Sequence, residues 1–379
     1  MNEAIRQLFP ITRRYIYLNH AAVAPLPQPS AEAMHRLIEE VARTGSVRWS
    51  AWMAEVERTR AKVAQLVSAR PEEIAFLRNT SEGISTIANG LSWQPGDNVV
   101  TCACEFPSNI YPWMQLERYG VQVRMAPERD GRIETDELLA LVDDRTRLIA
   151  VSFVQFASGF RMDLERIGDF CRRRGIFFFV DAIQGLGVHP FDVRRYQVDA
   201  FAADGHKWLL GPEGAAVLFL AERAWEKVRP TVVGWMSVKD WDRVLSSETL
   251  SYRLDYHDSA RRFECGTLNA IGLAGLSASL DLLLTVGIEA IDRHVLDLGT
   301  FLCEAAQAKG YRVVSSRRAG EASAIICLAH PERPAEEIVR RVEKEGIIVS
   351  ARCGRVRVAP HLYNTRDEME ALVAALPAA

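Results

Sequence analysis

Short apolar runs alternate with amphipathic stretches along the middle of the chain, and this alternation predicts the architecture. The apolar runs predict strands at 74–77, 98–102, 121–125, 148–154, 176–180, 200–203 and 215–220. Helical patterns such as 136–142 and 164–174 separate most of them. Short apolar strands that alternate with helices indicate a largely parallel sheet covered on both faces. The predicted fold class is therefore α/β, with a mainly parallel seven-stranded sheet.

The two ends of the chain have a different pattern. A strand-like segment is followed by a loop of small residues and two helices, which we expect at 15–18, 19–25, 31–44 and 52–66. Helices and short strands alternate near the C-terminus, at 288–308, 311–315, 324–328, 335–345 and 347–349, with a last helix from Thr365. This pattern predicts a smaller α+β domain at 285–379, completed by 1–14, beside a large domain at 15–284. The aromatic and polar stretch 230–261 is expected to cap a site or a dimer interface.

Polar side chains follow the predicted strands. Thr80 and Ser81 come at a helix start after the first strand, and Phe106 follows the second. Asp181 ends the apolar run 176–180, and Asp204, His206 and Lys207 follow the strand at 200–203. In a sheet of this kind, ligands bind outside the carboxyl ends of the strands. We therefore expect these side chains to meet at one site.

Each of these residues has a functional and an ordinary interpretation. A desolvated Lys207 favours its neutral form and can form a Schiff base, but it could also be a surface lysine. Thr80 and Ser81 could bind a phosphate at the helix N-terminus or simply cap the helix. Asp181 needs a cationic partner, which a protonated pyridine nitrogen would supply, and Phe106 offers an aromatic face. Taken together, these features indicate a site for pyridoxal 5′-phosphate.

Composition and charge exclude several other classes of function. The chain has 379 residues, 48% hydrophobic and 25% charged, with a net charge of -3, so we expect neither nucleic-acid nor membrane binding. Its 7 cysteines are scattered, which favours a reduced, cytoplasmic setting. Cys102 and Cys104 have no second pair at metal-site spacing, so no metal is expected. The glycine-rich nucleotide-binding patterns are missing after the strands, which argues against a nucleotide-binding protein.

Two motifs resemble the class V aminotransferase family of pyridoxal-phosphate enzymes. They are V-D-A-I-Q-G at 180–185 and D-G-H-K-W-L-L-G-P-E-G at 204–214. The family includes cysteine desulfurases, selenocysteine lyases and isopenicillin N epimerase-like proteins. The resemblance extends from residue 17 to about residue 364. It implies a fold type I enzyme and is specific for cofactor and fold rather than for the reaction.

The resemblance also implies roles for individual residues. Lys207 is the Schiff-base lysine and proton shuttle, Asp181 pairs with the pyridinium nitrogen, and Gln184 reaches the phenolic oxygen. Phe106 stacks on the ring. The phosphate is assigned to Thr80, Ser81 and His206, with Asp204 behind them, where many relatives have a serine.

The resemblance further implies a substrate site and a dimer. Arg352 matches the arginine that binds the substrate carboxylate, although Arg355 and Arg357 are close competitors; Asn19 and His20 are also expected at the substrate. Thr267 in F-E-C-G-T (263–267) implies a homodimer with shared sites, because this threonine reaches the phosphate of the neighbouring subunit in relatives. The alternative for Thr267 is a simple helix start.

The reaction is the least determined property. Desulfurases place a mobile cysteine a few residues after the carboxylate arginine and stack a histidine on the cofactor. This chain has no cysteine at 354–358 and has Phe106 at the stacking position. We therefore expect an aminotransferase acting on an amino acid. The alternatives are a cysteine desulfurase-like C–S lyase or an epimerase, and more remotely a non-catalytic ligand-binding relative.

Overall fold

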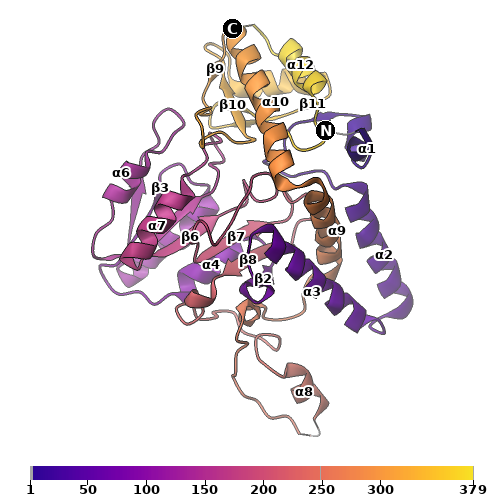
Figure 1. The fold of residues 1–379 in the computed structure, drawn as a ribbon, viewed down its shortest axis with the longest axis vertical. Coiled ribbons are helices and arrows are strands. Elements are labelled where there is room, and N and C mark those ends of the chain that lie inside the picture. Colours follow the sequence, from indigo (N-terminus) through magenta and orange to yellow (C-terminus); the bar gives the residue numbers. More distant parts are fainter. Residues whose placement is uncertain (1–2, 248, 379) are drawn as a thin grey trace.

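The computed structural model describes residues 3–247 and 249–378. Its central feature is a seven-stranded sheet with the strand order β2-β8-β7-β6-β5-β3-β4 (Figure 1). The strands are β2 (Ile74–Leu77), β3 (Asn98–Cys102), β4 (Gln122–Ala126), β5 (Thr146–Ser152), β6 (Phe177–Asp181), β7 (Ala200–Asp204) and β8 (Ala216–Leu220). The predicted α/β fold is confirmed, and each strand lies within two residues of its expected position.

Strand direction in this sheet brings one set of strand ends together. All of its strands run parallel except β8, which is antiparallel to its neighbours β7 and β2. All residues of β3, β6, β7 and β8 are buried, which explains why these strands are continuous apolar runs rather than alternating patterns. The carboxyl ends of the parallel strands therefore open on a single edge.

Helices connect and cover these strands: α4 (Thr80–Gly90), α5 (Tyr111–Met114), α6 (Thr135–Ala140) and α7 (Leu164–Arg174). Helix α4 packs against β7 and β8. This approach requires a glycine, because a Cβ on Gly83 would lie 2.6 Å from the Cβ of Ala202. Helix α5 is short and is followed by a 3-10 turn at Gln115–Tyr119.

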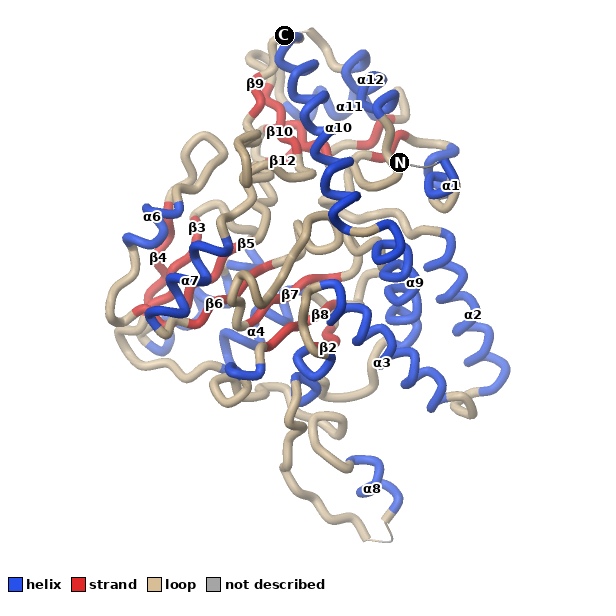
Figure 2. The backbone as a smooth tube through the Cα atoms, viewed as in Figure 1, coloured by secondary structure: helices blue, strands red, loops and turns tan. Residues whose placement is uncertain are grey.

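A helical layer flanks the sheet on the side of β2 and β8 (Figure 2). Helices α2 (Gln28–Thr44) and α3 (Trp49–Leu66) both pack against α9 (Ala270–Val286). Both begin three residues before their predicted starts, at 28 and 49. In α2 the extra turn includes Pro29, which is tolerated because the first N–H groups of a helix have no partner within it.

The C-terminal part forms a second, antiparallel sheet in the order β12-β13-β10-β9, at the top of Figure 1. Its strands are β9 (Arg312–Val313), β10 (Ile326–Ala329), β12 (Ser350–Arg352) and β13 (Arg355–Val358). Its helices are α10 (Ile288–Ala308), α11 (Ala335–Lys344) and α12 (Arg366–Ala375). The sequence analysis missed β13, because its R-V-R-V sequence alternates charge with apolar residues. The predicted domain division at 284 and 285 stays a prediction.

The N-terminal segment lies against the C-terminal part. It begins with α1 (Glu3–Arg6), and β1 (Ile16–Tyr17) pairs in parallel with β11 (Ile347–Ile348). The two ends of the chain are thereby joined beside the central sheet. The loop that follows β1 runs from this junction toward the edge where the parallel strands end.

Most of the residues at 230–247 and 249–261 project from the body of the molecule as an arm that carries α8 (Trp241–Ser246) (Figure 1). Trp241 contacts Trp49 and Trp235, with ring centroids 5.8 and 4.5 Å apart. Other arm side chains are largely exposed, including Tyr252 at 83%. The predicted capping of a site or interface by this arm stays a prediction.

Neither membrane-spanning helices nor metal clusters stand out in the part of the chain that the structure describes. No single helix at 3–247 or 249–378 is long and apolar enough to cross a membrane; only the pair α9 and α10, bent by 79°, has sufficient combined length and composition. The same residues contain no group of three or more His, Cys, Asp or Glu side chains placed to hold a metal ion.

Candidate active site

A cavity of about 380 Å³ lies at the carboxyl ends of the parallel strands, where the sheet topology predicts a site. It is lined by most of the residues expected from the sequence: Thr80, Ser81, Phe106, Asp181, Gln184, Asp204, His206, Lys207 and Arg352. These residues come from the last residues of β6, β7 and β12 and from the segments that follow β2, β3, β6 and β7. The small residues Ala21 and Ala22 also line it, so the loop after β1 approaches the cavity closely.

Lys207 stands directly after β7 with its amine inside the cavity, not at the outer surface. Its Nζ lies 5.7 Å from the centroid of the Phe106 ring. Burial lowers the pKa of this amine, and the nearby guanidinium of Arg357 lowers it further, while the Asp181 carboxylate opposes both. The shift favours the neutral amine, which is the form that attacks an aldehyde.

Asp181 is the last residue of β6 and is only 2% exposed. One of its carboxylate oxygens accepts the backbone N–H of Ile183 at 3.1 Å. Burial raises the pKa of Asp181, and the charge of the neighbouring Glu105 raises it further. A carboxylate in this position gains most from a cation brought in by a ligand.

The N-terminus of α4 also lines the cavity. Asn79 caps the helix, accepting the N–H of Glu82 at 2.9 Å. Thr80 is 6% exposed, and its Oγ1 has no hydrogen-bond partner among the described residues. Ser81 donates to or accepts from Ser108 across 2.8 Å. An unpaired hydroxyl at a positive helix end is suited to an anionic ligand such as a phosphate.

The carboxylate of Asp204 lies against the segment that follows it. One oxygen accepts the N–H of Gly205 at 2.7 Å, and the other lies 3.1 Å from Nδ1 of His206. This Nδ1 is buried and forms no hydrogen bond among the described residues, so the contact is one of proximity. His206 stands against the aspartate and also lines the cavity.

The amide of Gln184 is held at both of its atoms. Its Nε2 donates to the carbonyl of Ala21 at 3.1 Å, and its Oε1 accepts the indole N–H of Trp208 at 3.0 Å. The side chain is 5% exposed. Trp208 itself is completely buried directly after Lys207.

Two arginines line the cavity, and they differ in burial. Arg352 is exposed and donates to the adjacent carbonyl of Ala351, whereas Arg357 is 2% exposed. Arg357 donates to Ser350 Oγ at 3.3 Å and to the carbonyl of Phe156 at 3.1 Å, without an ion pair among the described residues. Burial and the charge of Arg352 lower the pKa of Arg357 to about 10. Arg355 is occupied elsewhere, by Glu128 at 2.9 Å.

Three expected residues do not line this cavity. His20 is completely buried, with Nδ1 against the carbonyl of Ala359 at 2.8 Å and Nε2 against the Tyr363 hydroxyl at 2.9 Å. This placement argues against substrate contact, because both ring nitrogens are used in packing. Asn19 forms a backbone bridge with Ala359. Thr267 is exposed and lines a separate hollow beside Cys265.

Glu105 follows the second predicted strand, but no role was predicted for it; it lies close enough to Asp181 to affect its pKa. Its buried carboxylate accepts the backbone N–H of Ser152 at 2.8 Å, the Gln155 amide at 2.7 Å and the Asn109 amide at 3.0 Å. Its position directly after β3 was the available signal. Glu105 increases the negative potential around Asp181.

No cysteine lines the cavity in the described part of the chain. Cys353 comes nearest in sequence to the lining residues. It is exposed at the turn between β12 and β13, with a φ of 48°. Its neighbour Gly354 has a φ of 70°, so the two residues form a tight hairpin turn.

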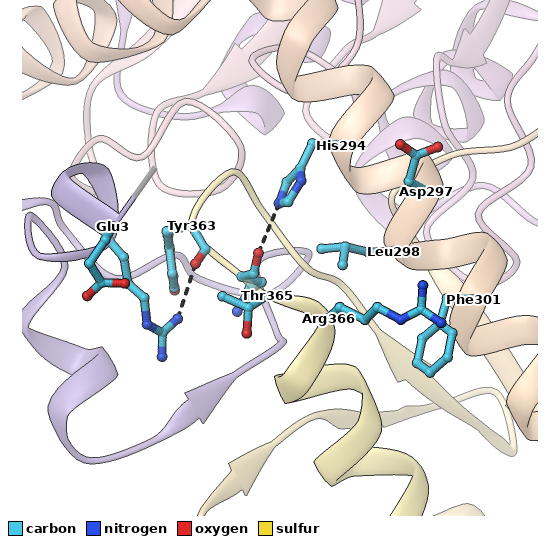
Figure 3. A pocket seen from close by; sticks show the side chains of 10 residues that line it. Glu3, His294, Asp297, Leu298, Phe301, Tyr363, Thr365 and Arg366 are labelled. Carbon is cyan, nitrogen blue, oxygen red and sulfur yellow. Dashed lines mark hydrogen bonds between the residues drawn. The ribbon is translucent and has the colours of Figure 1, made fainter. Parts of the chain in front are cut away.

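Another hollow, of about 320 Å³, lies between α1, α10 and the segment before α12 (Figure 3). Several of its polar groups are paired within the chain. Arg6 contacts the carbonyl of Tyr363 at 3.1 Å and Glu368 at 2.7 Å, and His294 contacts the carbonyl of Asn364 at 2.9 Å. Arg366 lies over the ring of Phe301. These contacts indicate that the residues around this hollow have a packing role and not a catalytic one.

Comparison with known proteins identifies the family. The model of the class V aminotransferases matches residues 16–372. The chain belongs to the class V aminotransferase family. A probable cysteine desulfurase from Methanothermobacter thermautotrophicus is 34% identical over 297 residues, 77% of this chain and 72% of that relative. An uncharacterized aminotransferase from Bacillus subtilis is 27% identical, covering 97% of this chain and 95% of its own.

Solved structures agree with this assignment. A cysteine desulfurase from Thermococcus onnurineus has a TM-score of 0.88 at 25% identity, covering 99% of this class V chain and 97% of its own. A cysteine desulfurase from Escherichia coli has a TM-score of 0.87 at 26% identity, with the same coverage of both chains.

Pyridoxal phosphate is the cofactor of this class V enzyme. The cavity fits each part of the cofactor. The unpaired hydroxyl of Thr80 at the start of α4 suits the phosphate, and the buried Asp181 suits a protonated ring nitrogen. Lys207 supplies an amine whose pKa burial lowers, as suits reaction with the aldehyde, and the half-exposed Phe106 supplies an aromatic face.

Proposed function

We propose that this enzyme is a pyridoxal-phosphate-dependent C–S lyase that acts on an amino acid of the cysteine class. The observation that carries the proposal is one cavity that unites Lys207, Asp181 and the unpaired, buried Arg357. The desulfurase relatives, at 34% identity in sequence and 25% and 26% among solved structures, support a sulfur-containing substrate.

The cofactor supplies an electron sink for negative charge at the substrate Cα. Lys207 would hold the cofactor and move the proton at Cα. Asp181 would keep the ring nitrogen protonated, Phe106 would cover the ring, and Gln184 would contact the phenolic oxygen. Thr80, Ser81 and His206 would bind the phosphate, with Asp204 beside His206.

We assign the substrate carboxylate to Arg357, in place of Arg352. Arg357 is buried in the cavity wall without an ion pair among the described residues, so a carboxylate would neutralise a charge that burial makes costly. Arg352 is exposed at the cavity rim, and we assign it a smaller contribution to binding of the substrate carboxylate. Arg355 is excluded by its pairing with Glu128.

The lack of a cysteine in the described cavity wall favours β-elimination over desulfuration to alanine. Desulfuration to alanine requires a thiol to take up the sulfur. In β-elimination, the proton leaves Cα, the Cβ–S bond breaks with its electron pair on sulfur, and the sulfur leaves as a protonated thiol or hydrogen sulfide. Water then releases pyruvate and ammonium, so no acceptor cysteine and no oxidant are needed.

Transamination is the second candidate. Its support is the Bacillus subtilis relative, described as an uncharacterized aminotransferase, which matches 97% of this chain. Both reactions begin with removal of the Cα proton by Lys207. They differ in the next step: in transamination Lys207 would pass that proton on to the cofactor, and in β-elimination the Cβ substituent would leave.

A substrate panel separates these candidates. Purified holoenzyme is incubated with cysteine, cystine, alanine and glutamate, while sulfide, pyruvate, keto acid and optical rotation are followed. Sulfide or persulfide with pyruvate supports the C–S lyase. A keto acid with conversion of the cofactor to its amine form overturns it in favour of transamination. Loss of optical rotation while the amount of amino acid stays constant overturns it in favour of epimerisation.

Two variants serve as controls for this panel. Lys207→Ala should lose the visible absorbance of the lysine-bound cofactor and all turnover. Cys353→Ser should keep pyruvate formation within about twofold of wild type, because Cys353 lies outside the cavity lining. Loss of turnover in Cys353→Ser would instead indicate an acceptor thiol and a desulfurase.

We also propose a homodimer in which Thr267 contacts the phosphate bound by the partner subunit. Thr267 is exposed beside the base of the arm, and arm side chains such as Val232, Trp235, Tyr252 and Leu254 are 39% to 83% exposed. A monomer rarely exposes such a set of apolar groups. Light scattering of the purified protein measures the oligomeric state, and a monomer at micromolar concentration would contradict the proposal.

A further inference from the structure

We propose that Trp208 is a positioning residue: its indole N–H holds the Gln184 amide so that an N–H donor, and not the amide oxygen, faces the phenolic oxygen of the cofactor. This inference rests on the proposed place of Gln184 beside that oxygen. Trp208 follows Lys207 directly, so the residue that carries the cofactor and the residue that orients its partner are adjacent in the chain.

The hydrogen bonds around Gln184 determine which way its amide points. An amide side chain has one acceptor atom and one donor atom with two N–H bonds. Trp208 donates to Oε1 at 3.0 Å, and Nε2 donates to the Ala21 carbonyl at 3.1 Å. The remaining N–H of Nε2 is the group left for a ligand in the cavity that Gln184 lines.

Rotating the amide by half a turn would break both interactions. The NH2 group would then face the indole N–H, placing donor against donor, and the oxygen would face the Ala21 carbonyl, placing acceptor against acceptor. Gln184 is 5% exposed, so water has little access to compensate. The indole N–H and the carbonyl together select one orientation.

Trp208 can act in this way because it is itself immobilised. It is 0% exposed, and its backbone carbonyl accepts the Nε2–H of His361 at 3.0 Å. Its ring packs 5.6 Å from the ring of His361. Gly187 leaves the space for this backbone, since a Cβ there would lie 2.4 Å from the Trp208 carbonyl oxygen.

A donor at the phenolic oxygen stabilises the negative charge on that atom. It therefore favours the form of the lysine-bound cofactor that predominates at high pH, above the midpoint of a pH titration followed by visible absorbance. Loss of an oriented donor should therefore raise this midpoint. A single hydrogen bond of ordinary net strength corresponds to a shift of roughly half a unit to one unit.

The experiment is a visible-absorbance pH titration of the holoenzyme, with cofactor affinity measured in parallel. Trp208→Phe removes the N–H and keeps an aromatic ring, and we expect it to raise the midpoint. Trp225→Phe is the matched control, because Trp225 donates its indole N–H to the Leu220 carbonyl at 3.0 Å and does not line the cavity. Its titration should match that of wild type.

A double-mutant cycle tests whether Trp208 acts through Gln184. Gln184→Ala should raise the midpoint, and adding Trp208→Phe to it should produce no further shift. An equal shift by Trp208→Phe in both backgrounds overturns the inference. No shift in Gln184→Ala overturns it together with the proposed place of Gln184, whereas a shift in Gln184→Ala alone overturns only the role of Trp208.

Gln184→Glu keeps the test decisive if Trp208→Phe does not fold. A glutamate accepts from Trp208 but has no N–H to donate, so it should raise the midpoint at least as far as Gln184→Ala. An unchanged midpoint would mean that the amide oxygen faces the cofactor, contrary to the proposal. Lys207→Ala, which tests the proposed function separately, should lose the band altogether.

Discussion

Several charged side chains of this cavity are buried without a full set of opposite charges or hydrogen bonds, and this incomplete pairing determines their chemistry. Asp181 is buried with a backbone N–H as its hydrogen-bond partner, and Arg357 is buried against a hydroxyl and a carbonyl. Lys207 lies between these charges, and burial lowers its pKa. Burying each of these charges without an opposite charge costs free energy of folding. Each one is complementary in charge or reactivity to one part of the cofactor or the substrate.

Asp181→Asn should stabilise the protein without cofactor at pH 8. Burial raises the pKa of Asp181, so the folded protein keeps a proton that the unfolded chain has lost, and stability falls as the pH rises from about 4 toward the raised pKa. Asparagine removes this cost, on the order of 1–3 kcal/mol. Urea unfolding of cofactor-free protein at pH 5 and pH 8 measures it.

Asp204→Asn is the control for that prediction. Asp204 is equally buried but accepts from Gly205 and contacts His206, so its replacement should not stabilise the protein at pH 8. A cofactor-free Asp181→Asn protein no more stable than wild type at pH 8 would contradict the prediction. The same variant should bind pyridoxal phosphate more weakly.

The three arginines of the β12–β13 hairpin should have separable kinetic effects. Arg357→Leu should raise KM by about 10- to 100-fold, the loss of a charge-assisted pair of 1.5–3 kcal/mol. Arg352→Leu should raise it less, because its side chain is exposed. Arg355→Leu, which loses only the contact with Glu128 and a carbonyl, should leave KM near wild type. A larger effect of Arg352 than of Arg357 would reverse the assignment.

At the scale of elements, the F-E-C-G-T motif connects three parts of the fold. The Glu264 carboxylate accepts the backbone N–H of Phe76 in β2 at 2.7 Å and pairs with Arg60 of α3 at 2.7 Å. Arg60 also donates to the Ile74 carbonyl at 2.7 Å. The motif glutamate therefore holds the loop that carries Thr267 against β2, at the edge of the central sheet.

Glu264→Gln should destabilise the fold by about 3–5 kcal/mol, since it leaves the guanidinium of Arg60 buried without its main partner. Urea unfolding compares it with Glu57→Gln. Glu57 pairs with the same arginine at 3.1 Å but is 43% exposed, so its loss should cost less than about 1 kcal/mol. Equal losses of unfolding free energy in the two variants would show that burial does not decide how strongly a glutamate pairs with Arg60.

At the scale of the whole molecule, buried histidines connect segments far apart in the sequence. His20 contacts Ala359 and Tyr363, and His361 contacts the Trp208 carbonyl. His189 lies between Asp292 and the backbone N–H of Ala324. Burial lowers the pKa of all three histidines, to about 4 for His361. They hold the C-terminal part on the central sheet as neutral rings.

The protein should therefore lose stability as the pH falls below 6.5. Between about 4 and 6.5 the unfolded chain binds protons at His361 that the folded protein does not, so stability rises with pH across that window. His361→Gln, which cannot be protonated, should reduce the slope by up to about 1.4 kcal/mol per pH unit. Thermal unfolding at several pH values measures it. His35→Gln, an exposed site on α2, should leave the slope unchanged.

Much of the central sheet and the cofactor site could be predicted from local sequence. Strands buried on both faces are continuous apolar runs, and they appeared at their predicted positions. In a parallel sheet the residues at the carboxyl ends of the strands converge, so the sequence predicts one site for Thr80, Phe106, Asp181 and Lys207, and all four line the same cavity. The chemistry of each side chain then identified the cofactor.

Where the local sequence pattern is compatible with more than one orientation of a side chain, only the tertiary structure decides which way the side chain points. The β12–β13 hairpin presents Arg357 to the cavity and pairs Arg355 with Glu128, which depends on strand register and not on sequence spacing. His20 faces inward because β1 pairs with β11, more than three hundred residues away. The D-G-H-K-W stretch marked Lys207 by sequence alone, but the contact of Trp208 with Gln184 exists only because folding brings two strand ends together.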